Sequence, residues 1–145
     1  MRQFTLLFTM AVIVGCSPQP DLSVSNAWVR KPPPGMAMSA AYFDVRWSGD
    51  SDSVKLIAVK SSVFDRVEIH TTSVQAGVAR MRKLDEVILV KDRTTHFAPG
   101  GMHLMLKDPD KSLDENSLID LTLIFVGHEP LTFVAGMSAA APRED

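Results

Sequence analysis

A histidine and a methionine stand two residues apart, at His103 and Met105, in an otherwise apolar segment. If this segment is a strand, both side chains point to one face, because strand side chains alternate between the two faces. The interleaved Met102, Leu104 and Leu106 then share the opposite face, which suits a hydrophobic core. The pattern predicts a strand with an apolar inner face and an imidazole beside a thioether on its outer face.

A second histidine and methionine, His70 and Met81, lie on two alternating runs joined by a short link that ends in Gly77. A symmetric turn centred on Gln75 and Ala76 places His70 opposite Met81, to within a residue if Gly77 makes a bulge. Their neighbours on the same strand faces are mostly polar, so core packing does not explain Met81. Two such pairs on outer faces would supply four ligands.

Two imidazoles and two thioethers favour one kind of ion. Thioether sulfur is a soft ligand that selects Cu(I) among first-row metals. Zinc sites favour thiolate, imidazole and carboxylate, whereas calcium and magnesium take oxygen ligands. Methionine has no proton to lose, and four protein ligands leave no obvious open position for a substrate. We therefore expect a carrier of Cu(I) rather than a catalyst.

Ten, twenty-one and one residues separate the four positions in His70, Met81, His103 and Met105. This spacing resembles the motif of the PCuAC family of periplasmic copper chaperones, over about residues 22–135. The flanking segments that are also similar are Val67–Thr72, Met81–Arg82, Phe97–Leu106, Pro32–Gly35, Ala41–Phe43 and Leu121–Phe125.

The resemblance implies a cupredoxin-like antiparallel β-sandwich with Greek-key connections, which binds one Cu(I) through His70, Met81, His103 and Met105. It also implies delivery of copper toward the copper centre of cytochrome c oxidase. The implied partners are the copper-bearing subunit of that oxidase and a Sco-like protein with a thioredoxin fold.

The chain departs from the family pattern in three places. Thr71 stands where some members have a methionine beside the first histidine, so an alternative ligand is missing. Residues 107–110, Lys-Asp-Pro-Asp, replace a more apolar continuation and alter the rim where a partner would dock. The tail lacks a His/Met-rich extension, which argues against a second site of the Cu(II) type.

The rest of the sequence predicts a single all-β domain. Short alternating runs recur from Leu22 onward, separated by turns rich in proline and glycine, which indicates a sandwich or barrel. No segment after the N-terminal region has sustained helical periodicity. We expect the domain to span residues 22–137, with a flexible tail at 138–145.

Residues 1–16 are expected to be a signal segment, with a short positive start, an apolar run and Gly15-Cys16 at its end. The sequence before Cys16 resembles a bacterial lipobox, in which that cysteine is lipidated; the alternative is an ordinary secretory signal cut nearby. Residues 17–21 would form a tether. The domain would then lie on the periplasmic side of a bacterial membrane, held by its lipid anchor.

Composition excludes several classes of function. Cys16 is the only cysteine, which excludes an internal disulfide and, once it is lipidated, thiol chemistry in the domain. The formal net charge is −2, and loss of Arg2 with the signal makes it about −3. With no basic cluster, we expect no nucleic acid partner. No Ser/His/Asp arrangement, buried carboxylate pair or phosphate loop supports an enzyme.

Some alternatives stay open at this point. The chain could be an adhesion or assembly lipoprotein in which His and Met are incidental, or a copper-dependent redox enzyme with an open coordination position. Met36 and Met38 could cover the copper site or pack in a loop and a strand start. His96 and His128 lie beside turns, and solvated loop positions are the simpler interpretation of both.

Overall fold

The computed structural model describes residues 20–33, 35–109 and 113–140. The expected signal segment with Cys16 lies outside these ranges, as do most of the tether and the last five residues of the expected tail. Within the ranges no helix is long and apolar enough to cross a membrane.

Ten strands make up the described part of the chain, which is all-β as predicted. The strands are β1 (Leu22–Arg30), β2 (Met38–Trp47), β3 (Ser53–Lys60), β4 (Phe64–Gln75), β5 (Val78–Leu84), β6 (Val87–Val90), β7 (Thr94–Phe97), β8 (Met102–Pro109), β9 (Leu118–Phe125) and β10 (Leu131–Ser138).

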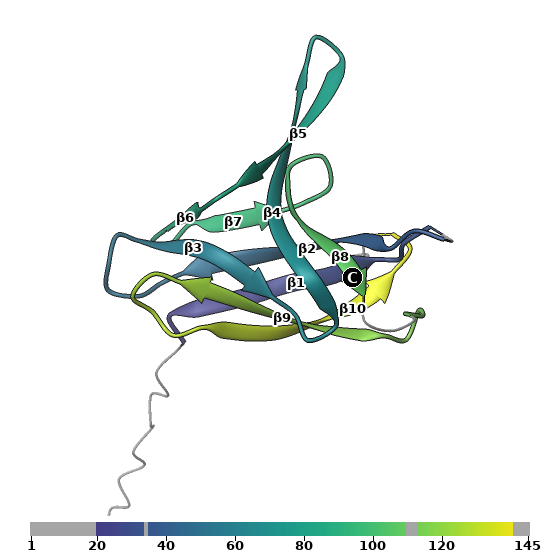
Figure 1. Ribbon diagram of the computed structural model, residues 1–145. Helices are drawn as coiled ribbons and strands as arrows, with labels where there is room; N and C mark the ends of the chain where they lie inside the picture. The colour runs from purple at the N-terminus through teal and green to yellow at the C-terminus, as the bar shows by residue number, and fades with distance from the viewer. Residues whose placement is uncertain (1–19, 34, 110–112, 141–145) are drawn as a thin grey trace, which may run out of the picture.

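The strands form one open sheet in the order β5-β4-β8-β7-β2-β1-β10-β9-β3-β6, with β8 also pairing with β2. The sheet folds over on itself, so that β3 and β9 lie across from the layer that contains β4 and β8 (Figure 1). Most neighbours pair antiparallel, but β1 and β10 run parallel, and so do β7 and β8 at their single paired position.

The core lies between the two layers and takes buried side chains from every strand except β5. The alternation of β9 is typical, since Ile119, Leu121 and Leu123 are completely buried while the residues between them are partly exposed. Phe43 and Phe97 stack with their ring centres 4.3 Å apart. Met137 is buried in the core, which is the usual place for a gap-filling methionine.

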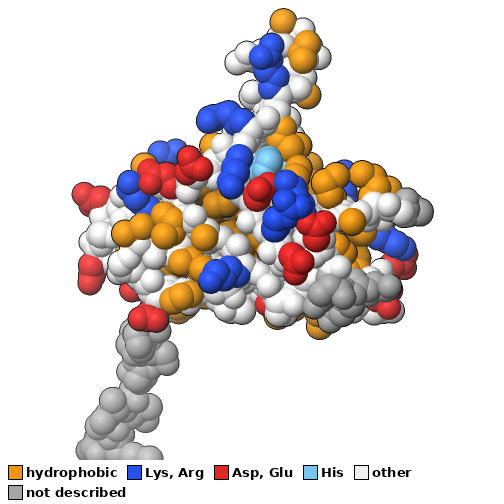
Figure 2. Space-filling view, viewed as in Figure 1, with side chains coloured by type: hydrophobic (Ala, Val, Ile, Leu, Met, Phe, Trp, Pro, Cys, Tyr) orange, Lys and Arg blue, Asp and Glu red, His pale blue; other side chains and the backbone are white. Residues whose placement is uncertain are grey.

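The outer parts of β4 and β5 form a hairpin that stands away from the body, with both faces exposed (Figure 1). Figure 2 shows Lys or Arg side chains and hydrophobic side chains on this projecting hairpin. Its turn is Ala76-Gly77, both at positive φ (50° and 77°), and Gln75 pairs with Val78. A two-residue turn with both φ angles positive matches the twist of hairpin strands, and glycine adopts such angles without strain.

The predicted register of this hairpin is wrong. The turn is centred one residue later than expected, so Met81 pairs with Thr72, and His70 pairs with Lys83. Because a one-residue move of the turn shifts the pairing by two residues, Met81 stays on the face of His70. The two side chains are therefore diagonal rather than opposite neighbours.

Candidate metal centre

Two of the four motif residues are positioned by β8. Leu104 and Leu106 are completely buried in the core, so His103 and Met105 point to the other face, as predicted. His103 pairs directly with His70 of β4, and Met105 pairs with Glu68 of the same strand. The two imidazole rings lie with their centres 6.0 Å apart.

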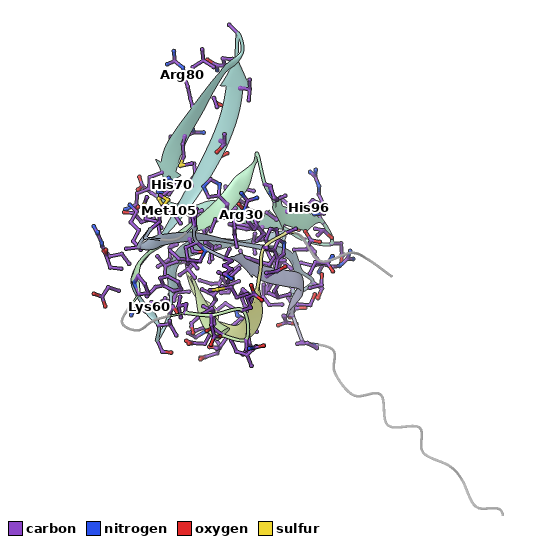
Figure 3. All side chains as sticks on the ribbon, turned by 90° about the vertical axis from the view of Figure 1, so that its right-hand side faces the viewer. Arg30, Lys60, His70, Arg80, His96 and Met105 are labelled. Carbon is purple, nitrogen blue, oxygen red and sulfur yellow. The ribbon has the colours of Figure 1, made fainter. Side chains whose placement is uncertain are left out.

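A groove of about 410 Å³ opens on this face beside the foot of the hairpin. Three of the four motif residues, Met81, His103 and Met105, line it, while His70 lies beside His103 and is not one of the lining residues. Figure 3 shows His70 and Met105 at the foot of the projecting hairpin. The other lining residues are Arg30, Lys31, Pro32, Pro33, Met36, Met38, Ser39, Ala40, Tyr42, Thr72 and Gly100.

The hydrogen bond of His70 to Glu68 shows which ring nitrogen carries the proton. Its Nε2 lies 3.0 Å from Oε2 of Glu68, and an ionised carboxylate can only accept, so Nε2 carries the proton and donates it. In the neutral ring Nδ1 then holds a lone pair. Among the described residues, this Nδ1 is the only buried side-chain nitrogen or oxygen without a hydrogen-bond partner. Such atoms are rare in proteins, and a metal ion would satisfy this one.

His103 is fixed in the complementary way. Its Nδ1 lies 3.1 Å from the carbonyl oxygen of Gly101, which can only accept, so Nδ1 donates and Nε2 keeps the lone pair. The side chain is 6% exposed. The ring of Tyr42 lies near the His103 ring, with the ring centres 6.4 Å apart. Each histidine thus has one nitrogen held by a protein acceptor and the other free to bind a metal.

Glu68 connects the site to a lysine. Its Oε2 accepts from Nζ of Lys107 at 2.6 Å as well as from His70, and Nζ of Lys83 lies 3.8 Å from Oε1. The hydrogen bond from Lys107, followed by that from His70, lowers the pKa of Glu68 to about 2. The carboxylate is therefore ionised at any physiological pH and orients the His70 ring.

Met81 is the most exposed of the four motif residues, with 52% of its surface accessible. It stands on the projecting hairpin, and β5 contributes to the core only the partly buried Leu84 that packs against it. The backbone N–H of Thr72, its pairing partner, donates to the carbonyl of Gly101 at 3.1 Å. This bond ties the hairpin to the loop before β8.

The two remaining histidines lie elsewhere. His96 is on β7, not in a loop, and its Nδ1 lies 2.6 Å from Oδ1 of Asp44. His128 is in the turn before β10 and packs edge-on against Trp47, with the ring centres 5.2 Å apart. Neither lines the groove.

Sequence reasoning assigned Glu68 no role and left the roles of Met36 and Met38 open. Glu68 lies two residues before His70, on the same strand face, and this alternation was the available signal. Within the described ranges, no three His, Cys, Asp or Glu side chains are grouped so as to hold a metal ion. The donors at the groove are imidazole nitrogen and thioether sulfur.

Comparison with known proteins identifies the family. The model of the family described as "Putative lipoprotein LpqE-like" matches residues 22–135. A "Putative lipoprotein Lxx21020" of Leifsonia xyli is 30% identical over 105 residues, which are 72% of this chain and 61% of that protein. An "Uncharacterized protein RP573" of Rickettsia prowazekii is 32% identical over 60% of this chain and 48% of its own length. The chain thus spans about half to three fifths of these curated relatives.

Solved structures share the fold. The copper-bound PCuAC domain from PmoF2 superposes with a TM-score of 0.69 at 27% identity, covering 86% of this chain and 97% of that domain. The apo PCuAC domain from PmoF1 gives the same TM-score at 26% identity, with 86% and 98% covered. Cu(I)-bound DR1885 from Deinococcus radiodurans, 22% identical over 87% of this chain and 83% of its own, has a TM-score of 0.64 and supports the fold alone. The chain belongs to the LpqE-like family, and its fold is the cupredoxin-like β-sandwich of PCuAC domains.

Proposed function

We propose that this protein is an exported Cu(I) chaperone that binds one ion through His70, Met81, His103 and Met105. The observation that carries the proposal is the pair of imidazoles, each with one nitrogen fixed as a donor and the other left free, beside a groove lined by thioethers. The copper held by the similar PmoF2 domain supports it. A ligand set without thiolate or carboxylate and without an open position suits a carrier rather than an enzyme.

Anaerobic titration of the domain against a chromophoric Cu(I) chelator tests the ligand set. The wild-type domain should take up one Cu(I) per chain, and Met105→Leu and Met81→Leu should each weaken its binding. The swap conserves volume and so tests ligation rather than packing. Met137→Leu, a core methionine, is the matched control and should bind as the wild type does. Wild-type affinity in both groove variants would refute the four-ligand assignment.

X-ray absorption of the loaded protein would count the neighbours of the metal. We expect nitrogen and sulfur in equal number around Cu(I). A nitrogen and oxygen shell around Cu(II) would instead favour a redox enzyme.

The adhesion or assembly alternative makes a different prediction. A ligand that binds only the folded state raises the melting temperature, by an amount set by its concentration relative to Kd. A chaperone should therefore melt higher with Cu(I), whereas a module with incidental His and Met should not. An unchanged melting temperature at saturating Cu(I) would favour the alternative.

We further propose that Cys16 is lipidated and holds the domain on the periplasmic side of a bacterial membrane. The description of the family and of the Leifsonia xyli relative as lipoproteins supports this. Fatty-acid labelling of the full chain should mark the wild type and not Cys16→Ala, which should leave the membrane fraction. Labelling of the variant would exclude Cys16 as the anchor.

The proposed destination of the copper is the copper-bearing subunit of cytochrome c oxidase, and a Sco-like protein with a thioredoxin fold is the second proposed partner. The loaded domain is mixed with the apo soluble domain of each candidate and separated, and the copper content of each fraction is measured. Transfer to either protein supports this route, and retention of copper by the loaded domain in both mixtures would refute it.

A further inference from the structure

Two methionines outside the four-residue motif also line the groove. Met36 precedes β2, and Met38 is its first residue. Their side chains are 48% and 43% exposed, so neither fills a gap in the core. Together with Met81 and Met105 they place four thioethers around one opening, two more than the proposed site uses.

Strand register places Met38 close to the proposed ligands. Ala40 of β2 pairs with Met105, and Met38 pairs with Lys107, so Met38 lies on the same sheet face as Met105 and diagonal to it. Diagonal neighbours are about 7–8 Å apart, a separation that long side chains can bridge. The ammonium of Lys107 bonds to Glu68 at 2.6 Å, and this ion pair balances the positive charge beside Met38.

The backbone that carries these methionines is held on both sides. The N–H of Met36 donates to the carbonyl of Pro33 at 3.1 Å, and the N–H of Asp108 donates to the carbonyl of Ala37 at 3.0 Å. The hydroxyl of Ser39 donates to the carbonyl of Arg30. These bonds hold the backbone in place, while the two exposed thioether side chains line the groove.

We propose that Met36 and Met38 form an exchange site that binds Cu(I) transiently as it enters and leaves the four proposed ligands. This inference rests on the proposed function. On release, a bond from copper to the thioether of Met36 or Met38 forms while a bond to one of the four ligands breaks, and loading is the reverse exchange. Copper stays Cu(I), and because thioethers are neutral, no proton or electron moves. The site would accept soft monovalent cations and would speed transfer without adding to the final affinity.

The test separates rate from affinity. The Met36→Leu/Met38→Leu variant and the wild type are loaded with one Cu(I), and release to a fixed excess of chelator is followed by stopped flow. We expect unchanged stoichiometry, affinity within about twofold, and release slowed at least fivefold. Leucine keeps the size and apolar nature of the side chain, so access to the groove is preserved. Met137→Leu is the matched control and should release copper at the wild-type rate.

Each other outcome is decisive. Release of copper at the wild-type rate by the double variant would overturn the exchange site. Loss of stoichiometric binding would also overturn it, since the two residues would then be permanent ligands. If the wild-type chain itself binds no Cu(I), the proposed function fails, which the wild-type titration reveals before the variant is measured.

Methyl spectra of protein labelled with ¹³C-methyl methionine give a second readout. At half an equivalent of Cu(I), the Met36 and Met38 methyl signals should broaden through exchange, while those of Met81 and Met105 should shift toward a bound position. Sharp, unmoved Met36 and Met38 signals throughout the titration would contradict the proposal.

Discussion

The two halves of the proposed site are supported in different ways. His103 and Met105 stand on β8, whose other face is completely buried at Leu104 and Leu106. Met81 stands on β5, which contributes no residue to the buried core and is exposed almost throughout. His103 and Met105 are therefore positioned by the folding of the whole domain, and Met81 by the local hairpin. Binding strength should depend on both halves, whereas global stability should depend on only one.

The largest expected effect is on the stability of the apoprotein. Leu104→Ala removes a completely buried side chain and should lower the free energy of unfolding by about 2–5 kcal/mol. Val74→Ala, on the projecting hairpin and 67% exposed, should change it by less than about 0.5 kcal/mol. Urea denaturation of both variants measures the difference. Similar losses would mean that the hairpin is part of the cooperative core.

The next effect concerns the orientation of His70. Glu68→Gln replaces the ionised acceptor of the His70 Nε2–H, and loss of such a partner typically lowers metal affinity about 10- to 100-fold. Glu86→Gln is the control, because Glu86 pairs with Lys55 at 3.1 Å and does not line the groove. Chelator competition gives both affinities. Equal affinities would show that Glu68 does not orient a ligand.

A smaller effect separates the hairpin from the body. Gly77→Ala and Gly127→Ala both place a methyl group at positive φ, 77° and 68°, where a Cβ meets no other atom. Each should cost about 1 kcal/mol locally. Gly77→Ala should weaken Cu(I) binding a few-fold with little change in melting temperature. Gly127→Ala, in the β9–β10 turn, should lower the melting temperature and leave Cu(I) binding nearly unchanged. If both variants changed Cu(I) binding and melting temperature alike, the hairpin would not be independent of the body.

The smallest expected effect is on acid stability, because the carboxylate of Glu68 is 22% exposed and solvent screens its ion pair. The pKa of Glu68 is about 2 in the folded protein and near 4.5 without its partners, so its carboxylate stabilises the fold above pH 4.5. That contribution is lost as the pH falls from about 4.5 through 2. Urea denaturation of the apoprotein at several pH values should show a shallower acid decline for Glu68→Gln than for the wild type. Parallel curves would indicate that the ion pair with Lys107 adds nothing.

Much of the fold could be predicted from alternation alone, because buried and exposed residues repeat every two positions along half-buried strands. The short alternating runs expected from Leu22 onward appear as strands, and His103 and Met105 face away from the core as expected. The parallel pairing of β1 with β10 could not be predicted, since it joins the two ends of the chain and depends on how the sheet closes.

The hairpin register shows where local patterns stop being informative. Both hairpin faces are exposed, so no buried face fixes the register, and only the turn does. Ala76 adopts a positive φ, which glycine, asparagine and aspartate adopt more readily than alanine. Ala-Gly is therefore not one of the residue pairs that predict a two-residue hairpin turn. The predicted face of Met81 is still correct, because the pairing register differs from the expected one by two residues, an even number.

Contacts between segments far apart in the sequence could not be predicted either. Glu68 forms an ion pair with Lys107, and Met38 lines the groove, only because β4 and β2 both pair with β8 in the sheet. Their role depends on three strand registers at once. Within the sequence, Met38 is simply a methionine near a proline-rich loop.

Strand β5 is also one of the two edge strands of the described sheet, and this has a consequence for solubility. An exposed edge offers backbone donors and acceptors to any other extended chain, which makes such edges sites of aggregation. Within β5, Arg80, Arg82 and Lys83 place three positive charges along that edge. Two copies that met edge to edge would bring like charges together. The same charges would still allow an acidic strand to pair there. They therefore disfavour association of the hairpin that carries Met81 with a second copy of itself.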